Sequence, residues 1–326
     1  MARHALLLSC LLPLVADAAS FDCAQASHPV ERAICADPAL SKMDEQLATT
    51  FRRARQLSIE GDNQLLEEQR SWLRETRQTC TAQADIAACA RNRYDWRLEE
   101  LASLPHAIEN FPETAALQLN EASAHFDFSL ALDAPCAAAI CEGSGRLAVL
   151  AKGSSKPLQV IALPGVFLSR RADGQPLVNS AQLYAYQGVI NVGDFNFDGA
   201  EDFAVQNGNR GSYGGPSYDV FLYEPRVRAF RYSRALSALI ESTLGFFGVD
   251  EQAQRLETFA KSGCCWHQRQ RYQVAHNQPV PVWRITEDAS SVHNEFVHID
   301  TEELIDGKWQ ITETKNIPQK EYFAEP

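Results

Sequence analysis

The sequence predicts an α+β protein with its two kinds of structure in separate domains. A small, disulfide-bonded all-helical domain comes first, and an antiparallel domain of the β-sandwich or barrel type follows. The spacing of apolar residues changes from three or four positions before residue 104 to two positions after residue 124. The length of 326 residues fits about two domains. Four cysteines lie between residues 20 and 105 and four lie after residue 105, so each domain has its own set.

Residues 1–19 have the pattern of a secretory signal peptide. Arg3 and His4 form a short polar start, an apolar run follows, and Ala16-Asp17-Ala18 is a small-x-small cleavage signal. The run is too short to span a bilayer as a helix. An alternative makes Cys10 the acylated cysteine of a lipoprotein, but only five residues separate it from Arg3-His4. We therefore expect an exported protein of the periplasm.

Residues 20–104 are expected to form the helical domain. Asp37 is a capping residue, and Pro38, which follows it, is suited to the first helical turn. Gly61-Asp62-Asn63 then interrupts the helical pattern. The core of so short a domain is marginal, so disulfides would help to stabilise it. The apolar stripes run through Leu40, Met43, Leu47, Phe51 and Ala54, then Leu65, Gln69, Trp72, Leu73, Thr76 and Cys80, and then Ile86, Ala90, Tyr94, Leu98 and Leu101.

Residues 105–123 are expected to be a linker or a wrap along the edge of the next domain, and residues 124–326 to form the β domain. His125–Leu132 alternates apolar and polar residues, as a half-buried strand does. Ser233–Leu244 is expected to be helical, and Asp306-Gly307 predicts a hairpin turn. The other expected strands include Leu147–Leu150, Val160–Leu163, Phe203–Val205, Tyr218–Tyr223, Tyr272–Val274, Val282–Ile285, Phe296–Ile299 and Trp309–Thr312.

The cysteines favour disulfides, because their number is even without Cys10 and exported proteins meet oxidising conditions. The eight are Cys23, Cys35, Cys80, Cys89, Cys136, Cys141, Cys264 and Cys265. The sequence does not fix their connectivity. We expect nearest neighbours to pair in the first domain, Cys23 with Cys35 and Cys80 with Cys89. In the second domain, Cys264 and Cys265 either form a vicinal bridge or pair with Cys136 and Cys141.

The segment from Asp194 to Asp202 resembles the first half of an EF-hand calcium loop. Oxygen-bearing side chains stand at positions 1, 3 and 5 and Gly199 at position 6, so hard oxygens can surround one Ca2+ ion. The flanks look like strands and position 12 is Val205, which predicts a strand–loop–strand site rather than an EF-hand. The alternative is a hairpin loop without metal. The expected ligands are Asp194, Asn196, Asp198, the Ala200 carbonyl and Asp202.

A glycine-rich segment at residues 207–218 follows the acidic loop directly. It contains serines and tyrosines, which binding loops favour because a tyrosine ring offers a large contact area at low entropic cost. Its glycines permit backbone conformations that other residues avoid. The segment is therefore either a projecting binding loop or an ordinary glycine-rich hairpin.

The charge of the chain excludes several classes of function. Asp+Glu 42 against Lys+Arg 30 gives a net charge of −12, so the basic surface of a non-specific nucleic-acid binder is absent, and an anionic membrane is an equally poor partner. The motifs of metalloproteases, serine hydrolases, phosphate loops and dinucleotide-binding folds are also missing from the sequence. The sequence thus gives no indication of an enzyme.

The first domain carries a specific set of motifs in order along residues 21–101. They are Phe21-Asp22-Cys23, Glu31-Arg32-Ala33-Ile34-Cys35-Ala36-Asp37-Pro38, Leu40, Met43-Asp44, Gln69-Arg70-Ser71-Trp72-Leu73, Cys80, Cys89, Tyr94 and Leu98. With these residues the segment resembles the lysozyme-inhibitor LprI N-terminal family. The resemblance implies a helical, disulfide-bonded fold, and some members of that family inhibit lysozyme.

The second domain resembles periplasmic immunity proteins that protect bacteria from secreted peptidoglycan hydrolases, and that are related in fold to periplasmic i-type lysozyme inhibitors. The likeness rests on Asp194–Asp202, Gly211–Tyr218 and Ser262-Gly263-Cys264-Cys265. In the related inhibitors a Ser/Tyr-bearing loop enters the lysozyme cleft and blocks its catalytic carboxylates. By this resemblance the inhibitory hydroxyls here belong to Ser212, Tyr213, Ser217 and Tyr218.

Three functions are compatible with these observations. The first is a periplasmic inhibitor, or immunity protein, of a lysozyme-like peptidoglycan hydrolase, whose deep cleft holds two carboxylates. The second is a calcium-stabilised envelope interaction module without an enzyme target, and the third is an envelope hydrolase. The sequence favours the first, and the acidic body would attract a basic lysozyme.

Overall fold

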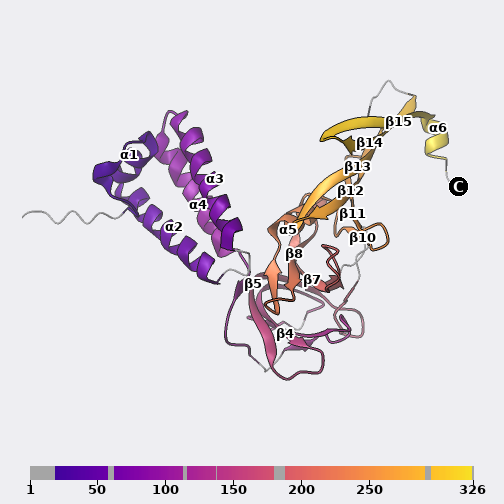
Figure 1. Ribbon diagram of the computed structural model, residues 1–326, viewed down its shortest axis with the longest axis horizontal. Helices are drawn as coiled ribbons and strands as arrows, with labels where there is room; N and C mark the ends of the chain where they lie inside the picture. Colours follow the sequence, from indigo (N-terminus) through magenta and orange to yellow (C-terminus); the bar gives the residue numbers. More distant parts are fainter. Residues whose placement is uncertain are drawn as a thin grey trace, which may run out of the picture. The chain divides into compact units, whose positions relative to one another are not determined.

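The structure is a computed structural model that describes residues 19–57, 62–112, 116–136, 138–179, 188–290 and 295–324. Within these ranges a helical region is followed by antiparallel sheets (Figure 1), which confirms the predicted α+β fold class. Cys10 and all of the predicted signal peptide except Ala19 lie outside the described residues. A search of the described helices finds none that is long and apolar enough to cross a membrane.

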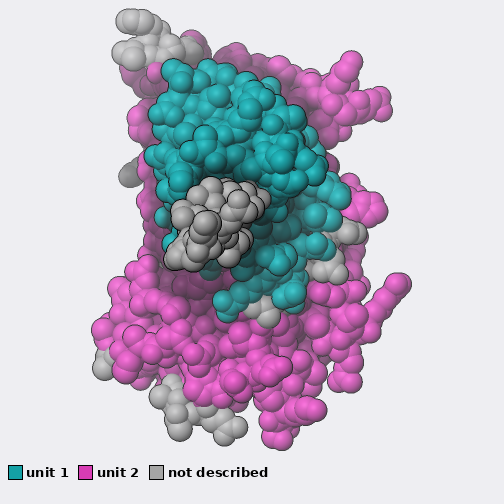
Figure 2. All heavy atoms as spheres, turned by 90° about the vertical axis from the view of Figure 1, so that its left-hand side faces the viewer, with its two compact units in different colours: residues 1–56, 63–102 teal, residues 57–62, 103–326 magenta. Residues whose placement is uncertain are grey.

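The chain divides into two compact units, drawn in teal and magenta in Figure 2. Unit 1 comprises Met1–Gln56 and Asn63–Ala102, and unit 2 comprises Leu57–Asp62 and Ser103–Pro326. The units correspond to the helical and β-rich parts of the sequence. Each is described separately below.

Unit 1 is helical because its local sequence supplies both start signals and apolar stripes. The His28 side chain accepts from the Val30 amide and the Glu31 carboxylate accepts from the His28 amide, a capping box at the first α-helix. Asp37 caps the second helix by accepting from the Ala39 and Leu40 amides. The elements are η1 (Cys23–Gln25), α1 (Pro29–Ala36), α2 (Pro38–Leu57), α3 (Asp62–Thr81) and α4 (Ile86–Ala102).

Each apolar stripe of unit 1 contains buried side chains. The fully buried side chains include Leu40 and Leu65, and the Trp72 ring packs edge-on against Tyr94 with ring centroids 5.2 Å apart. The disulfides Cys23–Cys35 and Cys80–Cys89 join nearest neighbours, as expected from the sequence. Of the predicted break at Gly61-Asp62-Asn63, Gly61 lies outside the described residues and α3 starts at Asp62.

In the described residues of unit 2, the strands form three antiparallel sheets. The first has the strand order β1-β5-β4-β3-β2, the second β6-β7-β8-β9, and the third is a meander from β10 to β15. The bounds are β1 (His106–Ala107), β2 (Leu117–Gln118), β3 (Phe126–Leu132), β4 (Ile140–Ala151), β5 (Pro157–Ser169), β6 (Ile190–Gly193), β7 (Asp202–Gly211), η2 (Ser212–Gly214), β8 (Gly215–Glu224), β9 (Ala229–Tyr232), α5 (Arg234–Glu241), β10 (Gly248–Asp250), β11 (Arg255–Ser262), β12 (Trp266–Ala275), β13 (Gln278–Asp288), β14 (Phe296–Ile305), β15 (Lys308–Pro318) and α6 (Gln319–Tyr322).

The second sheet is buried on both faces, because alternate side chains of its strands enter two different cores. Phe203 and Val205 of β7 join a core with the first sheet, where the Phe203 and Phe128 rings lie 5.1 Å apart. Ala204 between them faces a second core with α5 and the first strands of the third sheet, including Leu256. The first two sheets thus form the expected sandwich, and this arrangement makes the middle layer nearly continuously apolar.

Two further local predictions agree with the structure. The predicted helix at 233–244 contains α5, whose first turn is capped by the Ser233 hydroxyl. Asp306 and Gly307 both have positive φ, 52° and 73°, and connect β14 to β15 as a two-residue hairpin turn.

The 105–123 segment is not a free linker. His106–Ala107 pair with β5 and Leu117–Gln118 pair with β3, which makes them the outer strands of the first sheet. The backbone groups at a sheet edge need hydrogen-bond partners, and this segment supplies them. Leu119 and Ala122 are also buried in the sandwich core. The described residues of this segment therefore belong to the β fold.

Candidate functional site

The glycine-rich segment becomes an exposed tip between β7 and β8. The tip is the η2 turn, Ser212–Gly214, and Tyr213 is 63% exposed there. Tyr213 has φ +58°, a left-handed conformation uncommon for residues other than glycine, asparagine and aspartate. A Cβ at Gly211 would lie 2.9 Å from the Gly215 carbonyl oxygen, so the tight return of the chain requires glycine. The segment thus presents an aromatic side chain on a strained, narrow turn.

The Tyr213 side chain is held in place by the turn between β11 and β12. Its hydroxyl oxygen accepts a hydrogen bond of 2.6 Å from the Gly263 amide, and the Lys261 ammonium lies 4.9 Å from its ring centroid. The neighbouring Ser212 is half-buried and donates its hydroxyl to the Ser242 carbonyl at 3.3 Å. The exposed tip is therefore fixed by contacts from residues distant in sequence.

Ser217 and Tyr218 cannot serve as exposed inhibitory hydroxyls, because each is only 1% exposed. The Ser217 hydroxyl donates to the Asn207 side chain at 2.7 Å, and the Tyr218 hydroxyl donates to the Gly188 carbonyl at 2.8 Å. Burial raises the pKa of the Tyr218 phenol. Because side chains alternate along β8, Tyr218 lies in the second core and Ser217 is part of the buried polar network. Of the four expected hydroxyls, only those of Ser212 and Tyr213 lie at the tip.

The turn that contacts Tyr213 contains the vicinal disulfide Cys264–Cys265. Cys136 pairs with Cys141, so of the two alternatives for the second domain the structure has the vicinal bridge. Gly263 has φ +64° and precedes the bridge directly. We define the tip surface as Ser212–Gly214 together with Lys261–Cys265.

A buried polar network lies beneath the tip. The Asn207 amide donates to the Asp219 carboxylate at 2.8 Å and accepts from Ser217. Burial raises the pKa of Asp219 to about 7. Arg210 forms an ion pair of 3.0 Å with Glu241 of α5. The Asn207 contacts fix β7 and β8 to each other at the end where the tip begins, and the exposed Arg210–Glu241 pair joins β7 to α5.

The acidic loop, Asp194–Asp202, precedes β7. Both Asp194 carboxylate oxygens accept backbone amides, from Asp198 at 3.1 Å and Gly199 at 2.8 Å, and Asp198 accepts from the Ala200 amide at 2.8 Å. The Asn196 amide donates to Asp198 at 3.0 Å. The loop is thus folded tightly around its own oxygen atoms.

Asp202 is oriented differently from the other expected calcium ligands. It is fully buried and its two oxygens accept from the Phe195 and Tyr223 amides, both at 2.8 Å. Burial, with smaller contributions from the nearby Asp198 and Asp194 charges, raises its pKa to about 8. In the described chain, no cluster of three or more His, Cys, Asp or Glu side chains is arranged to hold a metal ion. The donor chemistry of the loop, carboxylate and amide oxygens on one tight turn, nevertheless suits a hard cation.

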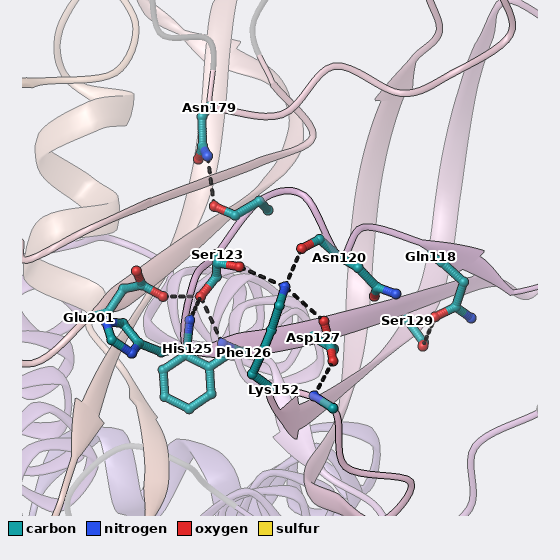
Figure 3. A network of polar contacts seen from close by, with 12 residues as sticks. Gln118, Asn120, Ser123, His125, Phe126, Asp127, Ser129, Lys152, Asn179 and Glu201 are labelled. Atoms are coloured by element: carbon teal, nitrogen blue, oxygen red, sulfur yellow. Dashed lines mark hydrogen bonds and ion pairs between the residues drawn. The ribbon is translucent and has the colours of Figure 1, made fainter.

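The acidic loop is also attached to the first sheet (Figure 3). Glu201 accepts a hydrogen bond from the Ser123 hydroxyl. The Lys152 ammonium donates to the Ser123 carbonyl at 2.8 Å and pairs with Asp127 at 3.0 Å. A hydrogen bond from the Gly153 amide, more than the Lys152 charge, lowers the pKa of Asp127. No local sequence pattern indicates a role for these residues, which anchor the loop rather than form a reactive site.

Unit 1 contains a cavity of about 370 Å³ between its N-terminal residues and helices α1 to α4. Its polar groups are arranged in pairs. The Arg77 guanidinium lies 2.6 Å from the Glu31 carboxylate, and the Tyr94 hydroxyl donates to Asp44 at 2.8 Å. Asp44 and Tyr94 belong to the family motifs, and Tyr94 also to an apolar stripe, but nothing local in the sequence indicates that residues 50 positions apart meet.

Comparison with known proteins finds a similar solved structure and a matching family model. A solved structure described as a Xanthomonas type IV secretion system related protein has a TM-score of 0.51 with this chain, at 23% identity, covering 64% of this chain and 99% of the other. That similarity concerns the fold alone. No curated protein matches the sequence. The model of the family described as "Lysozyme inhibitor LprI" matches residues 22–101, so the helical unit of this protein is an LprI lysozyme-inhibitor family domain.

Proposed function

We propose that this protein is a periplasmic inhibitor, or immunity protein, of a lysozyme-like peptidoglycan hydrolase, and that it has no catalytic activity of its own. The LprI family match at residues 22–101 carries the inhibitory function. The exported location is supported by the signal-peptide pattern of residues 1–19 and by disulfides in both units. The partner is a glycan-cleaving enzyme with a deep carboxylate-lined cleft.

The tip surface is the proposed inhibitory element of unit 2. Tyr213 combines 63% exposure with a fixed phenol position, set by the Gly263 amide. A side chain that is already ordered loses little conformational entropy on binding, which favours affinity. The ring fills a sugar subsite of the target, and Ser212 donates to a catalytic carboxylate after exchanging its bond to Ser242. Ser217 and Tyr218 act only in the framework.

The test is inhibition of a panel of lysozymes and secreted peptidoglycan hydrolases by the full exported chain. The double variant Ser212→Ala/Tyr213→Ala is expected to raise the inhibition constant at least about 30-fold, since a hot-spot residue contributes about 2 kcal/mol or more. Phe323→Ala is the matched control, because Phe323 is an aromatic side chain of similar exposure, 56%, outside the tip surface. Unchanged inhibition by the double variant, at unchanged melting temperature, would remove the tip surface from the mechanism.

The family match covers unit 1 and not the tip, which favours a second binding surface in unit 1. The mouth of the unit 1 cavity includes Leu73, which is 38% exposed, and Gln25. Leu73→Glu in the full chain places a charge there without disturbing the buried core. Loss of inhibition by this variant alone assigns binding to unit 1, and loss by both variants shows that each unit contributes to binding.

We also propose that the acidic loop binds one Ca2+ ion through Asp194, Asn196, Asp198, the Ala200 carbonyl and Asp202. Hard oxygen donors at alternate positions of one tight loop support the proposal, because a divalent cation offsets the repulsion between neighbouring carboxylates. For Asp202 to join, its carboxylate has to share its lone pairs between the ion and the Phe195 and Tyr223 amides. The ion is structural in this proposal, since the loop leads into β7 and hence to the tip.

A further inference from the structure

The turn between β11 and β12 contains a disulfide bond between adjacent residues. Ser262 pairs with Trp266 across the two strands, so the turn itself consists of Gly263, Cys264 and Cys265. The bond between Cys264 and Cys265 closes a small ring that includes the peptide bond joining them. Rotation of the backbone in the turn is therefore restricted for as long as the disulfide is intact.

This bond adds little to the stability of unit 2 as a cross-link. A disulfide stabilises a fold mainly by closing a loop of the unfolded chain, and the effect grows with the length of that loop. Cys264 and Cys265 are adjacent, whereas the other disulfides described above span 5, 9 and 12 positions. The effect of the vicinal bond is therefore local to its turn.

The turn makes a backbone contact on each side of the disulfide. Before it, the Gly263 amide donates to the Tyr213 hydroxyl oxygen at 2.6 Å. After it, the Cys265 carbonyl accepts a hydrogen bond of 2.7 Å from the amide of Ala289, the residue that follows β13. Tyr213 is 63% exposed, so the position of its ring depends on Gly263 and on the Lys261 ammonium. The conformation of the turn thus determines where the phenol of the tip lies.

The disulfide is also accessible to a reactant in solution. Cys264 is exposed and Cys265 is half-buried, whereas Cys80 and Cys141, which belong to two other bridges, are buried. Thiol–disulfide exchange requires contact between a thiolate and a sulfur atom, so exposed bridges are the ones that react. Accessibility and a local effect on the backbone are the properties of a regulatory disulfide.

We propose that Cys264–Cys265 is a redox site that regulates the tip surface, and that its reaction partner is a dithiol, the reduced Cys-x-x-Cys pair of a thiol–disulfide exchange protein. The inference rests on the proposed function of the tip. With the disulfide intact, Gly263 holds Tyr213 in the position that binds the target. With the disulfide reduced, the turn rotates, the Gly263 amide leaves the phenol, and binding has to order Tyr213 at an entropic cost.

The exchange balances in atoms and electrons. A thiolate of the dithiol attacks Sγ of Cys264, the bond to Cys265 breaks, a mixed disulfide forms with Cys264, and the Cys265 thiolate takes up a proton. The second thiol of the partner loses its proton and attacks the neighbouring partner sulfur, which releases Cys264 as a thiolate that is protonated in turn. Two electrons and two protons pass to the protein, and the partner becomes a disulfide. The reverse reaction restores the bridge.

The test compares the oxidised and the reduced form of the full exported chain. Dithiothreitol is the dithiol probe, and it is removed under anaerobic conditions before the assay so that the target enzyme keeps its own disulfides. Peptide mass mapping identifies the stage at which Cys264–Cys265 alone is open. Reduction is expected to raise the inhibition constant at least about tenfold, and reoxidation to restore it. A chain in which another bridge opens first would contradict the assignment.

Serine variants separate the disulfide from the reductant. Cys264→Ser/Cys265→Ser keeps the turn open, so it is expected to inhibit as weakly as the reduced chain and not to respond to dithiothreitol. Cys136→Ser/Cys141→Ser is the matched control, because it removes another short-range disulfide of unit 2 outside the tip surface. The control should respond to dithiothreitol as the wild type does. Equal inhibition by the oxidised chain, the reduced chain and Cys264→Ser/Cys265→Ser would overturn the proposal.

A second readout needs no target enzyme. Tyrosine rings are isotopically labelled, and Tyr213→Phe identifies the Tyr213 signal in the NMR spectrum. Reduction of Cys264–Cys265 is expected to shift that signal, because the phenol loses its hydrogen bond from Gly263. An unchanged Tyr213 signal would overturn the coupling between the disulfide and the tip.

The two proposals fail in different ways. If Ser212→Ala/Tyr213→Ala inhibits as well as the wild type, the proposed function of the tip is wrong, and the redox site has no inhibition to regulate. If that variant loses inhibition while reduction changes neither the inhibition constant nor the Tyr213 signal, the function of the tip stands and the redox inference alone is overturned.

Discussion

Asp219 illustrates what single buried residues contribute to this fold. Its carboxylate lies in β8, hydrogen-bonded to Asn207, and burial raises its pKa to about 7 from the usual 3.8. A carboxyl whose pKa is raised in the folded state binds a proton there that the unfolded chain has lost. Its contribution to stability is complete below pH 4 and declines as the pH rises to about 7.

We therefore expect Asp219→Asn to flatten the pH dependence of unit 2 stability. The wild-type free energy of unfolding should fall between pH 4 and pH 7, with about 4 kcal/mol as the upper limit of the Asp219 contribution. The pKa of Asp202 is also raised, so Asp202 adds a similar decline in the free energy of unfolding up to about pH 8, in the wild type and in Asp219→Asn alike. Urea unfolding of unit 2 at pH 5 and pH 8 measures the difference. Asp95→Asn, an exposed helical control, keeps the wild-type slope, and the same slope in Asp219→Asn would contradict the assignment.

At the residue scale, the sequence distinguished exposed from buried hydroxyls only in part. The alternation of Tyr218 with Val220 and Leu222 places all three in the second core, and this period-two pattern is visible in the sequence. The burial of Ser217 follows from its hydrogen bond to Asn207 ten positions away, which no local pattern reveals. The bond between Tyr213 and Gly263 is likewise non-local, since 50 positions separate them.

At the scale of elements, the turn with the vicinal disulfide supports the tip. Cys264 is exposed, whereas Cys80 and Cys141 are buried at 0% and 3% exposure. Thiol–disulfide exchange requires access of the attacking thiolate to a sulfur atom, so exposure sets the order of reaction.

Mild reduction is therefore expected to open Cys264–Cys265 before Cys80–Cys89 and Cys136–Cys141. Alkylation followed by peptide mass mapping measures the order. Opening of the vicinal bridge should also increase hydrogen exchange at the Gly263 amide, because the bridge restrains the turn that donates to Tyr213. Simultaneous loss of all the disulfides would show that the fold does not protect the buried bridges.

The acidic loop gives a second test at this scale. If Ca2+ binds only the folded state, it stabilises unit 2 by about 2.7 kcal/mol at a concentration one hundred times the dissociation constant. EDTA is then expected to lower the melting temperature of unit 2, and Asp194→Asn/Asp198→Asn to abolish the response to calcium. Calorimetry with and without EDTA, together with elemental analysis, measures both effects. A melting curve unaffected by EDTA, in a protein free of calcium, would reject the site.

Several elements were predictable because their signals are local. The helix start at Pro38, α5, and the turn at Asp306-Gly307 depend on residues within a few positions of each other. The short strands β1 and β2 were less clear, because two-residue strands carry no alternation. Their existence depends on pairing with β5 and β3, and pairing is a tertiary property.

At the scale of the whole molecule, each of the disulfides described above lies within one unit. Cys23–Cys35 and Cys80–Cys89 lie in unit 1, and Cys136–Cys141 and Cys264–Cys265 in unit 2. Even cysteine numbers in each half indicated this from the sequence. The division of unit 2 into three sheets was not predictable, because the partners of each strand depend on long-range packing. The double burial of β7, for example, requires both the first sheet and α5.

The net charge of −12 gives the last prediction, which concerns association of the whole molecule with its target. Residues 105–326 carry 27 acids and 18 bases, against 14 and 11 in residues 21–104, so the acidic excess lies mainly in unit 2.

Opposite net charges accelerate the encounter of two proteins, and salt screens that attraction with a Debye length of about 10 Å at 0.1 M. With a basic lysozyme-like target, the association rate constant is expected to fall about tenfold between low salt and about 0.5 M NaCl. The dissociation rate constant should change much less, because short-range contacts at the tip surface control it. Stopped-flow measurement of both constants over this range tests the prediction, and a salt-independent association rate would show that the acidic body does not steer the encounter.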